Sequence, residues 1–232
     1  YVLGYNSRGY NGTDVALIKY SADGKLRWAR SFDGGNENNS DIGKSAAVFN
    51  SGINYFIYAA CDISVSGYGN QAGLLKYDSA GNLLWSKYIA TGVNSTVTKL
   101  TLDISGNIYI AGGTSSQPYI LKFNSNGDTL WMRKPPVPVN YYNGVANDIT
   151  VDSAGNVYST GKIYDPVTNF DMITFKYNSS GVLQWNKIYN YVNSSDQGNA
   201  LEFSSSGNLY VTGASNAANS QPDILIIKYN VL

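Results

Sequence analysis

The sequence predicts an all-β protein assembled from one repeated unit. A lysine followed by an aromatic residue recurs five times, and a glycine lies five residues after each of the first four lysines. Every tryptophan of the chain lies nine residues after one of those same four lysines. The lysine–aromatic pairs are Lys19-Tyr20, Lys76-Tyr77, Lys122-Phe123, Lys176-Tyr177 and Lys228-Tyr229. Because Trp28 and Trp185 are three steps apart, the period is about 52 residues, which is typical of repeat architectures.

Each unit divides into four short strands, A to D. In the fourth unit the expected strands cover residues 148–152, 156–160, 171–177 and 182–189. A Gly-Asn pair marks the A–B turn, and a small residue followed by glycine marks the C–D turn; both supply the backbone freedom that tight hairpins need. Since no segment shows a sustained 3.6-residue period, we expect no helix.

Four strands in each unit with one aromatic pattern indicate a β-propeller. We expect a single domain over 1–232 with about five blades, which are four-stranded except at the two ends. The blade units cover residues 1–32, 45–89, 98–134, 146–190 and 199–230. The sequence opens inside a strand B and closes after a strand C, so we expect that N-terminal residues of the full-length protein are missing. All four tryptophans are expected to be largely buried between sheets.

The repeat also resembles a known family. The pattern D-S-x-G-N-[VIL]-Y-[VI]-[TA]-G, followed by D-x-x-x-x-K-Y-x-x-x-G-x-x-x-W, resembles the bacterial β-propeller repeat called SBBP, the seven-bladed β-propeller repeat. The resemblance covers nearly the whole chain. It implies a propeller, a secreted or surface-exposed protein, and a largely structural repeat that shares no catalytic residue.

Composition and charge exclude several classes of function. The chain has no histidine, which removes Ser-His-Asp and Cys-His triads and zinc sites with histidine ligands. Sixteen basic residues balance sixteen acidic ones, so nothing favours a nucleic-acid partner. No apolar run is long enough for direct membrane insertion. The single cysteine, Cys61, forms no intrachain disulfide and is expected to be a small buried residue.

The candidate binding surface consists of the B–C and D–A connections, which alternate with the short turns. These connections are long and differ in every unit, and variable loops on a rigid scaffold often carry function. Their tyrosines, with Asn, Ser and Gly around them, resemble the composition of adaptable binding surfaces. The expected long loops cover residues 5–13, 33–44, 62–71, 90–96, 135–145, 162–170 and 190–199. The candidate ligand-binding residues are Tyr5, Tyr10, Tyr68, Tyr141, Tyr142 and Tyr164.

Metal and cofactor signals are weak. Six oxygen-bearing side chains gather in nine residues, a set that could hold calcium or could be a solvated polar loop. They are Asp33, Asn36, Glu37, Asn38, Asn39 and Asp41. The stretch 22–28 resembles the tryptophan-docking motif of quinoprotein dehydrogenases, but the same Gly-x-x-x-Trp spacing also follows from turn chemistry. We therefore expect no cofactor, with calcium as the open alternative.

These observations favour a non-enzymatic, extracytoplasmic interaction or scaffold module that binds a protein or another cell-surface partner, as part of a larger assembly. One alternative is a lectin-like propeller, in which tyrosines stack on a sugar. The other is an enzyme, either a quinoprotein-type oxidoreductase or a propeller lyase, for which the residues offer no convergent acid–base pair.

Overall fold

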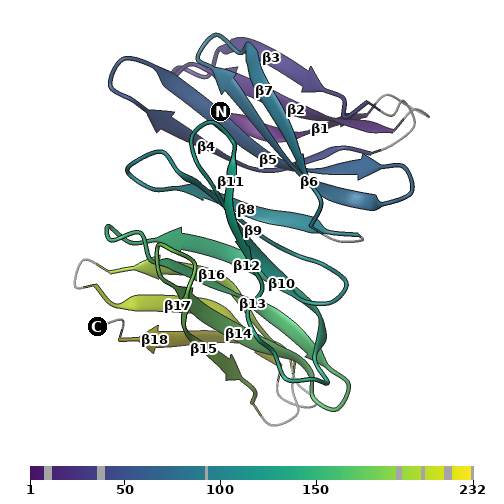
Figure 1. Ribbon diagram of the computed structural model, residues 1–232, viewed down its shortest axis with the longest axis vertical. Helices are drawn as coiled ribbons and strands as arrows, with labels where there is room; N and C mark the ends of the chain where they lie inside the picture. The colour runs from purple at the N-terminus through teal and green to yellow at the C-terminus, as the bar shows by residue number, and fades with distance from the viewer. Residues whose placement is uncertain are drawn as a thin grey trace. The chain divides into compact units, whose positions relative to one another are not determined.

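The computed structural model is all-β (Figure 1). It describes residues 1–7, 12–35, 40–91, 94–191, 195–204, 207–216 and 221–230. Within these ranges the chain forms 18 strands and no helix, as the sequence predicts. It follows that no helix of the described ranges could cross a membrane. The strands fall into two compact units, Tyr1–Leu102 and Asp103–Leu232, which we describe separately.

Unit 1 contains two antiparallel sheets. The first has the order β1-β2-β3 and the second the order β4-β5-β6-β7, while β8 packs against β4 and β5. The strands are β1 (Val2–Ser7), β2 (Thr13–Tyr20), β3 (Leu26–Phe32), β4 (Ile42–Asn50), β5 (Tyr55–Val65), β6 (Gly69–Asp78), β7 (Leu83–Ile89) and β8 (Thr96–Leu102).

Unit 2 contains a long sheet with the order β11-β10-β9-β12-β13-β14-β15 and a sheet with the order β16-β17-β18. A single residue pair, Val145 with Gly113, joins β12 to β9 in the long sheet. The strands are β9 (Ile108–Gly113), β10 (Pro118–Phe123), β11 (Thr129–Arg133), β12 (Tyr142–Val151), β13 (Val157–Asp165), β14 (Asn169–Tyr177), β15 (Leu183–Tyr189), β16 (Ser195–Phe203), β17 (Leu209–Asn216) and β18 (Asp223–Tyr229).

The repeated residues of the sequence occupy the same cross-strand register in each repeat. In every C–D hairpin the repeated lysine pairs with the repeated tryptophan, and a β-bulge follows the lysine. The pairs are Lys19 with Trp28, Lys76 with Trp85, Lys122 with Trp131 and Lys176 with Trp185. The bulge accommodates one extra residue on strand D, between the turn and the tryptophan, so the lysine–tryptophan spacing of nine is a consequence of hairpin geometry.

The core of each unit lies between successive sheets. In unit 1, Val15 and Leu17 of β2 pack with Ile57, Ala59 and Cys61 of β5. All five are fully or almost fully buried, and alternation along each strand places them on one face. Cys61 is therefore a small buried residue, and burial raises the pKa of its thiol far above the ordinary value.

Two expectations about the connections are wrong. Residues 62–71 and 162–170 are not long loops, because the B and C strands continue as paired hairpins to Val65 with Gly69 and to Asp165 with Asn169. Only three residues remain in each turn. The backbone is left-handed at Gly67, Gly69 and Asn169, which lets the strands reverse so tightly.

The expectation that all four tryptophans are largely buried is confirmed. Trp131 is buried, and Trp28, Trp85 and Trp185 are partly buried. Trp131 belongs to a core cluster of unit 2, and Trp28 and Trp185 pack against core clusters of their own units.

Candidate functional site

Each sheet has two ends with different chemistry. The A–B and C–D turns lie at one end, which we call the turn end. The B–C and D–A connections lie at the other, which we call the loop end. Antiparallel pairing with consecutive strands places these connections alternately in this way.

At the turn end of unit 1, three side chains of one sheet bind the backbone of the next C–D turn. Lys19 Nζ donates to the Ser79 carbonyl at 3.0 Å, and Trp28 Nε1 donates to the same oxygen at 3.3 Å. Arg30 Nε donates to the Gly81 carbonyl at 2.8 Å. We call this arrangement the turn clamp.

Unit 2 repeats the turn clamp with equivalent residues. Lys122 Nζ and Trp131 Nε1 donate to the Ser179 carbonyl at 3.0 and 3.4 Å, and Arg133 Nε donates to the Gly181 carbonyl at 2.7 Å. At these two places the recurring Lys, Trp and Arg therefore hold neighbouring repeats together. The resemblance of 22–28 to a quinone-docking motif has this structural explanation.

In the A–B turns of unit 2, an aspartate carboxylate accepts hydrogen bonds from other residues of the same turn and its following strand. Asp103 accepts from the backbone N–H groups of Ser105 and Asn107, from the Asn107 amide, and from the Tyr109 hydroxyl. Asp152 makes the same four contacts one repeat later. Burial, with the Asp103 charge, raises the pKa of Tyr109 well above its ordinary value.

Two cavities lie between such turns in unit 2. The larger, about 480 Å³, is lined by Asp152, Tyr158 and Lys176 among others. A cavity of about 220 Å³, lined by Asp103, Lys122 and Asp152, lies at the equivalent place one repeat earlier. Because the same hollow recurs with the repeat, it follows from turn geometry and is a poor candidate for a dedicated site.

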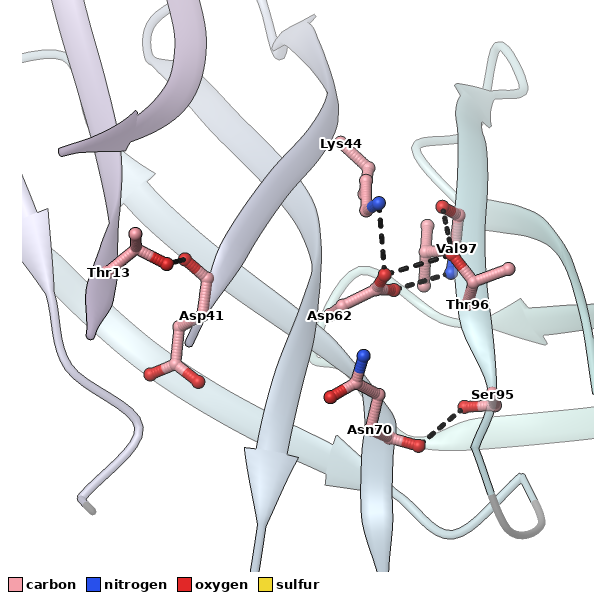
Figure 2. A network of polar contacts seen from close by, with 8 residues as sticks. All are labelled: Thr13, Asp41, Lys44, Asp62, Asn70, Ser95, Thr96 and Val97. Carbon is pink, nitrogen blue, oxygen red and sulfur yellow. Dashed lines mark hydrogen bonds and ion pairs between the residues drawn. The ribbon is translucent and has the colours of Figure 1, made fainter. Parts of the chain in front are cut away.

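The loop end of unit 1 contains buried carboxylates that tie connections together (Figure 2). Asp62 accepts from the Val97 N–H at 2.6 Å and the Thr96 hydroxyl at 2.9 Å, and forms an ion pair with Lys44 at 3.1 Å. Asp41 accepts from the backbone N–H groups of Gly34 and Ser64 at 2.6 and 3.0 Å. Burial raises the pKa of Asp41.

The candidate calcium loop is only partly described. Asp33 and Asp41 lie within the described residues, whereas Asn36, Glu37, Asn38 and Asn39 lie outside them. In the part of the chain that the structure describes, no three His, Cys, Asp or Glu residues gather as a metal site would require. The calcium alternative stays a prediction.

Tyr141 is fixed by a hydrogen bond at the loop end of unit 2. Its hydroxyl donates to Asp171 Oδ2 at 2.6 Å, and its ring packs against the core of the unit. Thr168 and Asn190 also donate to the fully buried Asp171 carboxylate. Burial raises the pKa of Asp171, with Asp165 adding to the rise, while the bonds from Tyr141 and Thr168 act against it. This arrangement anchors a connection.

Tyr142 and Tyr164 begin an aromatic row on unit 2, in which Tyr142 is exposed and Tyr164 is half-buried. They are cross-strand partners with ring centroids 5.1 Å apart, and Phe170 follows at 5.2 Å from Tyr164. Lys162 Nζ lies 4.4 Å from the centroid of the Phe170 ring. The structure thus brings together two of the predicted tyrosines, in strands rather than in loops.

An apolar pocket of about 230 Å³ lies at the loop end of unit 1. Tyr68 is 66% exposed at the tip of the β5–β6 hairpin, and Tyr88 is 51% exposed on β7. The buried Gln71 donates to the Tyr68 carbonyl at 3.1 Å, which fixes that hairpin. The pocket is lined by Val65, Tyr68, Gln71, Tyr88, Ile89 and Ala90.

The two remaining candidate ligand-binding residues are Tyr5 and Tyr10, and the structure describes only Tyr5. Tyr5 lies in β1 and is exposed, although a loop was expected there. Tyr10 lies outside the described residues. Sequence reasoning missed Tyr88, whose position three residues after the repeated tryptophan holds Ser31, Lys134 and Ile188 in the other repeats. Because the four repeats hold four different residues there, the repeat does not dictate Tyr88.

Comparison with known proteins supports the repeat and the fold. Residues 84–120 match the family model described as SBBP, beta-propeller repeat, which confirms the resemblance. No curated protein matches the chain.

Solved structures share the fold at low identity. The K499G mutant of NanB sialidase from Streptococcus pneumoniae has a TM-score of 0.60 and 10% identity, over 90% of this chain and 33% of that chain. The leech intramolecular trans-sialidase has a TM-score of 0.53 and 11% identity, over 95% of this chain and 36% of that chain. A putative exo-β-1,3-galactanase from Bifidobacterium bifidum has a TM-score of 0.50 and 14% identity, over 99% of this chain and 87% of that chain.

The chain therefore spans about a third of the length of these two sialidases. At such identities the likeness shows the fold alone, a propeller fold that this chain shares with enzymes.

Proposed function

From the premise that this chain carries an SBBP β-propeller repeat, we propose that it is a non-enzymatic binding module that works outside the cytoplasm. Its partner is a protein at the cell surface, held at the loop end of the sheets. The low share of charged residues, 14%, and the secreted or surface-exposed character that the family resemblance implies support this location.

The single observation that carries the proposal is the pocket of unit 1. Its lining is apolar apart from Gln71, and two exposed tyrosines stand at its rim. Tyrosine offers a large contact area with little loss of side-chain entropy, and it is enriched where protein interfaces are strongest. A pocket of about 230 Å³ suits one apolar side chain of a partner as an anchor.

The perturbed groups at the loop ends support binding rather than catalysis. A catalytic carboxylate must reach its substrate. Asp171, whose pKa is raised, is fully buried and accepts hydrogen bonds from Tyr141, Thr168 and Asn190. The carboxylate of Asp171 therefore holds connections in place through these hydrogen bonds.

Affinity capture with matched variants tests the proposal. The full chain serves as bait for secreted and cell-surface proteins of its source, alongside Tyr68→Ser/Tyr88→Ser and the control Tyr55→Ser. Tyr55 is half exposed and begins β5, at the turn end of the same sheet. A partner retained by the wild type and the control but lost by the double variant is expected. Equal retention by all three baits would overturn the assignment of the loop end.

A carbohydrate partner is the second candidate. The exposed Tyr142, which leads a row with the half-buried Tyr164 and Phe170, favours it, because aromatic faces stack on sugar rings. A glycan array separates the two candidates. Binding that Tyr142→Ser abolishes and Tyr68→Ser does not affect would favour the carbohydrate.

A further inference from the structure

A proline-rich connection lies between β11 and β12 of unit 2. Residues 134–140, which we call the proline segment, read Lys-Pro-Pro-Val-Pro-Val-Asn. β11 has five residues, whereas β3, β7 and β15 at the equivalent places have seven. Proline has no N–H to donate to a neighbouring strand, so the strand ends just before Pro135. The prolines therefore replace the end of an edge strand by an unpaired segment.

Local chemistry makes the proline segment extended. Each proline fixes its own φ at about −65°, and a residue before a proline avoids the helical region. Every residue from 134 to 138 is restricted in one of these ways. Burial alternates as an extended chain requires, since Pro135 is buried and Val137 packs against the core of unit 2. Pro136 and Pro138 are exposed between and after them.

Three hydrogen bonds hold the proline segment in place. Asn186 of β15 donates from its side-chain amide to the Pro136 carbonyl at 2.7 Å. The Tyr141 N–H donates to the Pro138 carbonyl at 3.0 Å, and the Tyr141 hydroxyl donates to Asp171 at 2.6 Å. All of these residues belong to unit 2. A segment that is already ordered loses little further conformational entropy when a partner binds it.

The exposed side of the proline segment is apolar. It consists of the rings of Pro136 and Pro138 and the side chain of Val139, which is fully exposed. From 135 to 140 the sequence has no charged residue, so this surface does not attract nucleic acid or anionic lipid. Extended proline segments dock into grooves that are lined with aromatic side chains. Tryptophan and tyrosine in such a groove also bring a hydrogen-bond donor for the backbone carbonyls.

We propose that the proline segment is a second binding element of the chain, which docks into an aromatic-lined groove of a protein partner. Pro136, Pro138 and Val139 make the contacts. The segment belongs to unit 2, whereas the pocket that carries the proposed function belongs to unit 1. Either assignment can therefore fail without the other.

Site-specific photo-crosslinking in the full chain tests the inference. p-Benzoylphenylalanine at Asn140 lies beside the three contact residues and leaves them intact. The matched control carries it at Val167, which is 77% exposed in the β13–β14 turn at the loop end of the same unit. Both proteins are mixed with secreted and cell-surface proteins of the source, and mass spectrometry locates the crosslinked residues. We expect a crosslink from position 140 and none from position 167, at a partner site that carries tryptophan or tyrosine.

Titration of the purified partner then measures the contacts. Val139→Ser should weaken binding by about tenfold or more, as the loss of a central apolar contact does. It should leave the free energy of unfolding unchanged, because Val139 is fully exposed in the free chain. Pro136→Ser/Pro138→Ser should weaken binding further, and Val167→Ser should bind as the wild type does. No crosslink from position 140, a crosslinked site without aromatic residues, or full binding by Val139→Ser and the double variant would overturn the inference.

Discussion

At the residue scale, Tyr141 shows where local sequence reasoning stops. Its place after a proline-rich segment and beside Tyr142 predicts an exposed ligand contact. The structure instead gives it a hydrogen bond to Asp171, which lies 30 residues away in the sequence. A contact over that separation leaves no mark in the local pattern. Tyr142, its neighbour, is exposed as expected, so local sequence reasoning predicts exposure for one of these two rings and misses the long-range contact of the other.

The variant Tyr141→Phe tests this anchoring role. It removes a hydrogen bond to a buried carboxylate, and such bonds contribute about 1.5 to 3 kcal/mol. We expect the free energy of unfolding, measured with urea, to fall by about that amount. Tyr142→Phe is the control and should change it little. Equal effects of the two variants would show that Asp171 needs no bond from Tyr141.

The raised pKa of Asp171 predicts a pH dependence with a definite sign. Because the folded-state pKa lies above the unfolded value, protonation favours the folded state. The stability that protonated Asp171 contributes is fully present below the pKa of the unfolded state. It is lost as the pH rises through the pKa of the folded state. Asp171→Asn has no such proton.

We therefore expect the wild type to gain unfolding free energy relative to Asp171→Asn as the pH falls from about 7 to about 4. Urea unfolding of both proteins at each pH measures this difference. A difference that stays constant or shrinks at lower pH contradicts the assigned direction.

At the element scale, the turn clamp explains the repeated lysine, tryptophan and arginine of the first and third repeats. Lysine, tryptophan and arginine must each reach a carbonyl of the next C–D turn, and the turn must accept the tryptophan ring. A methyl group built on Gly81 would lie 2.9 Å from ring atoms of Trp28. The glycine is thus required twice, for its left-handed φ of 84° and for the approach of the ring.

Two glycine variants separate these requirements. Gly24 has a similar φ of 79° in the equivalent turn, but a methyl group there meets no atom within 4 Å. Gly24→Ala should cost about 1 to 2 kcal/mol for the left-handed backbone alone. Gly81→Ala should cost at least about 1 kcal/mol more, because it also displaces Trp28. Unfolding free energies measure both, and equal costs would mean that the ring does not depend on Gly81.

Elements were predicted with uneven success, for a physical reason. Turns rich in glycine and asparagine are recognisable in the sequence. The paired strands on both sides of Gly155 and Gly181 are therefore predicted correctly. The ends of the β5–β6 and β13–β14 hairpins are predicted as loops from the sequence. Their Ser, Gly, Tyr and Asn residues do not show the alternation of apolar and polar residues that is typical of a strand. Their pairing depends on neighbouring sheets and on positive φ at Gly69 and Asn169, which composition does not reveal.

At the scale of the whole molecule, the sequence repeat predicts the fold because the four C–D hairpins share one lysine–tryptophan register. Each of the two compact units also contains one turn clamp. The boundary between the compact units, after Leu102, falls inside the expected third blade, 98–134. The single domain and its blade limits stay predictions. The residues of the proposed binding site, Tyr68 and Tyr88, lie at positions that the repeat does not dictate.

The central claim is that partners meet the loop end of the sheets rather than the turn end. Site-specific photo-crosslinking tests it most directly, with p-benzoylphenylalanine placed at Tyr68 in one protein and at Tyr55 in another. Both positions are exposed on the sheet β4–β7, at opposite ends of β5. We predict a crosslinked partner from position 68 and none from position 55. A crosslink from position 55 with none from position 68 would contradict the account.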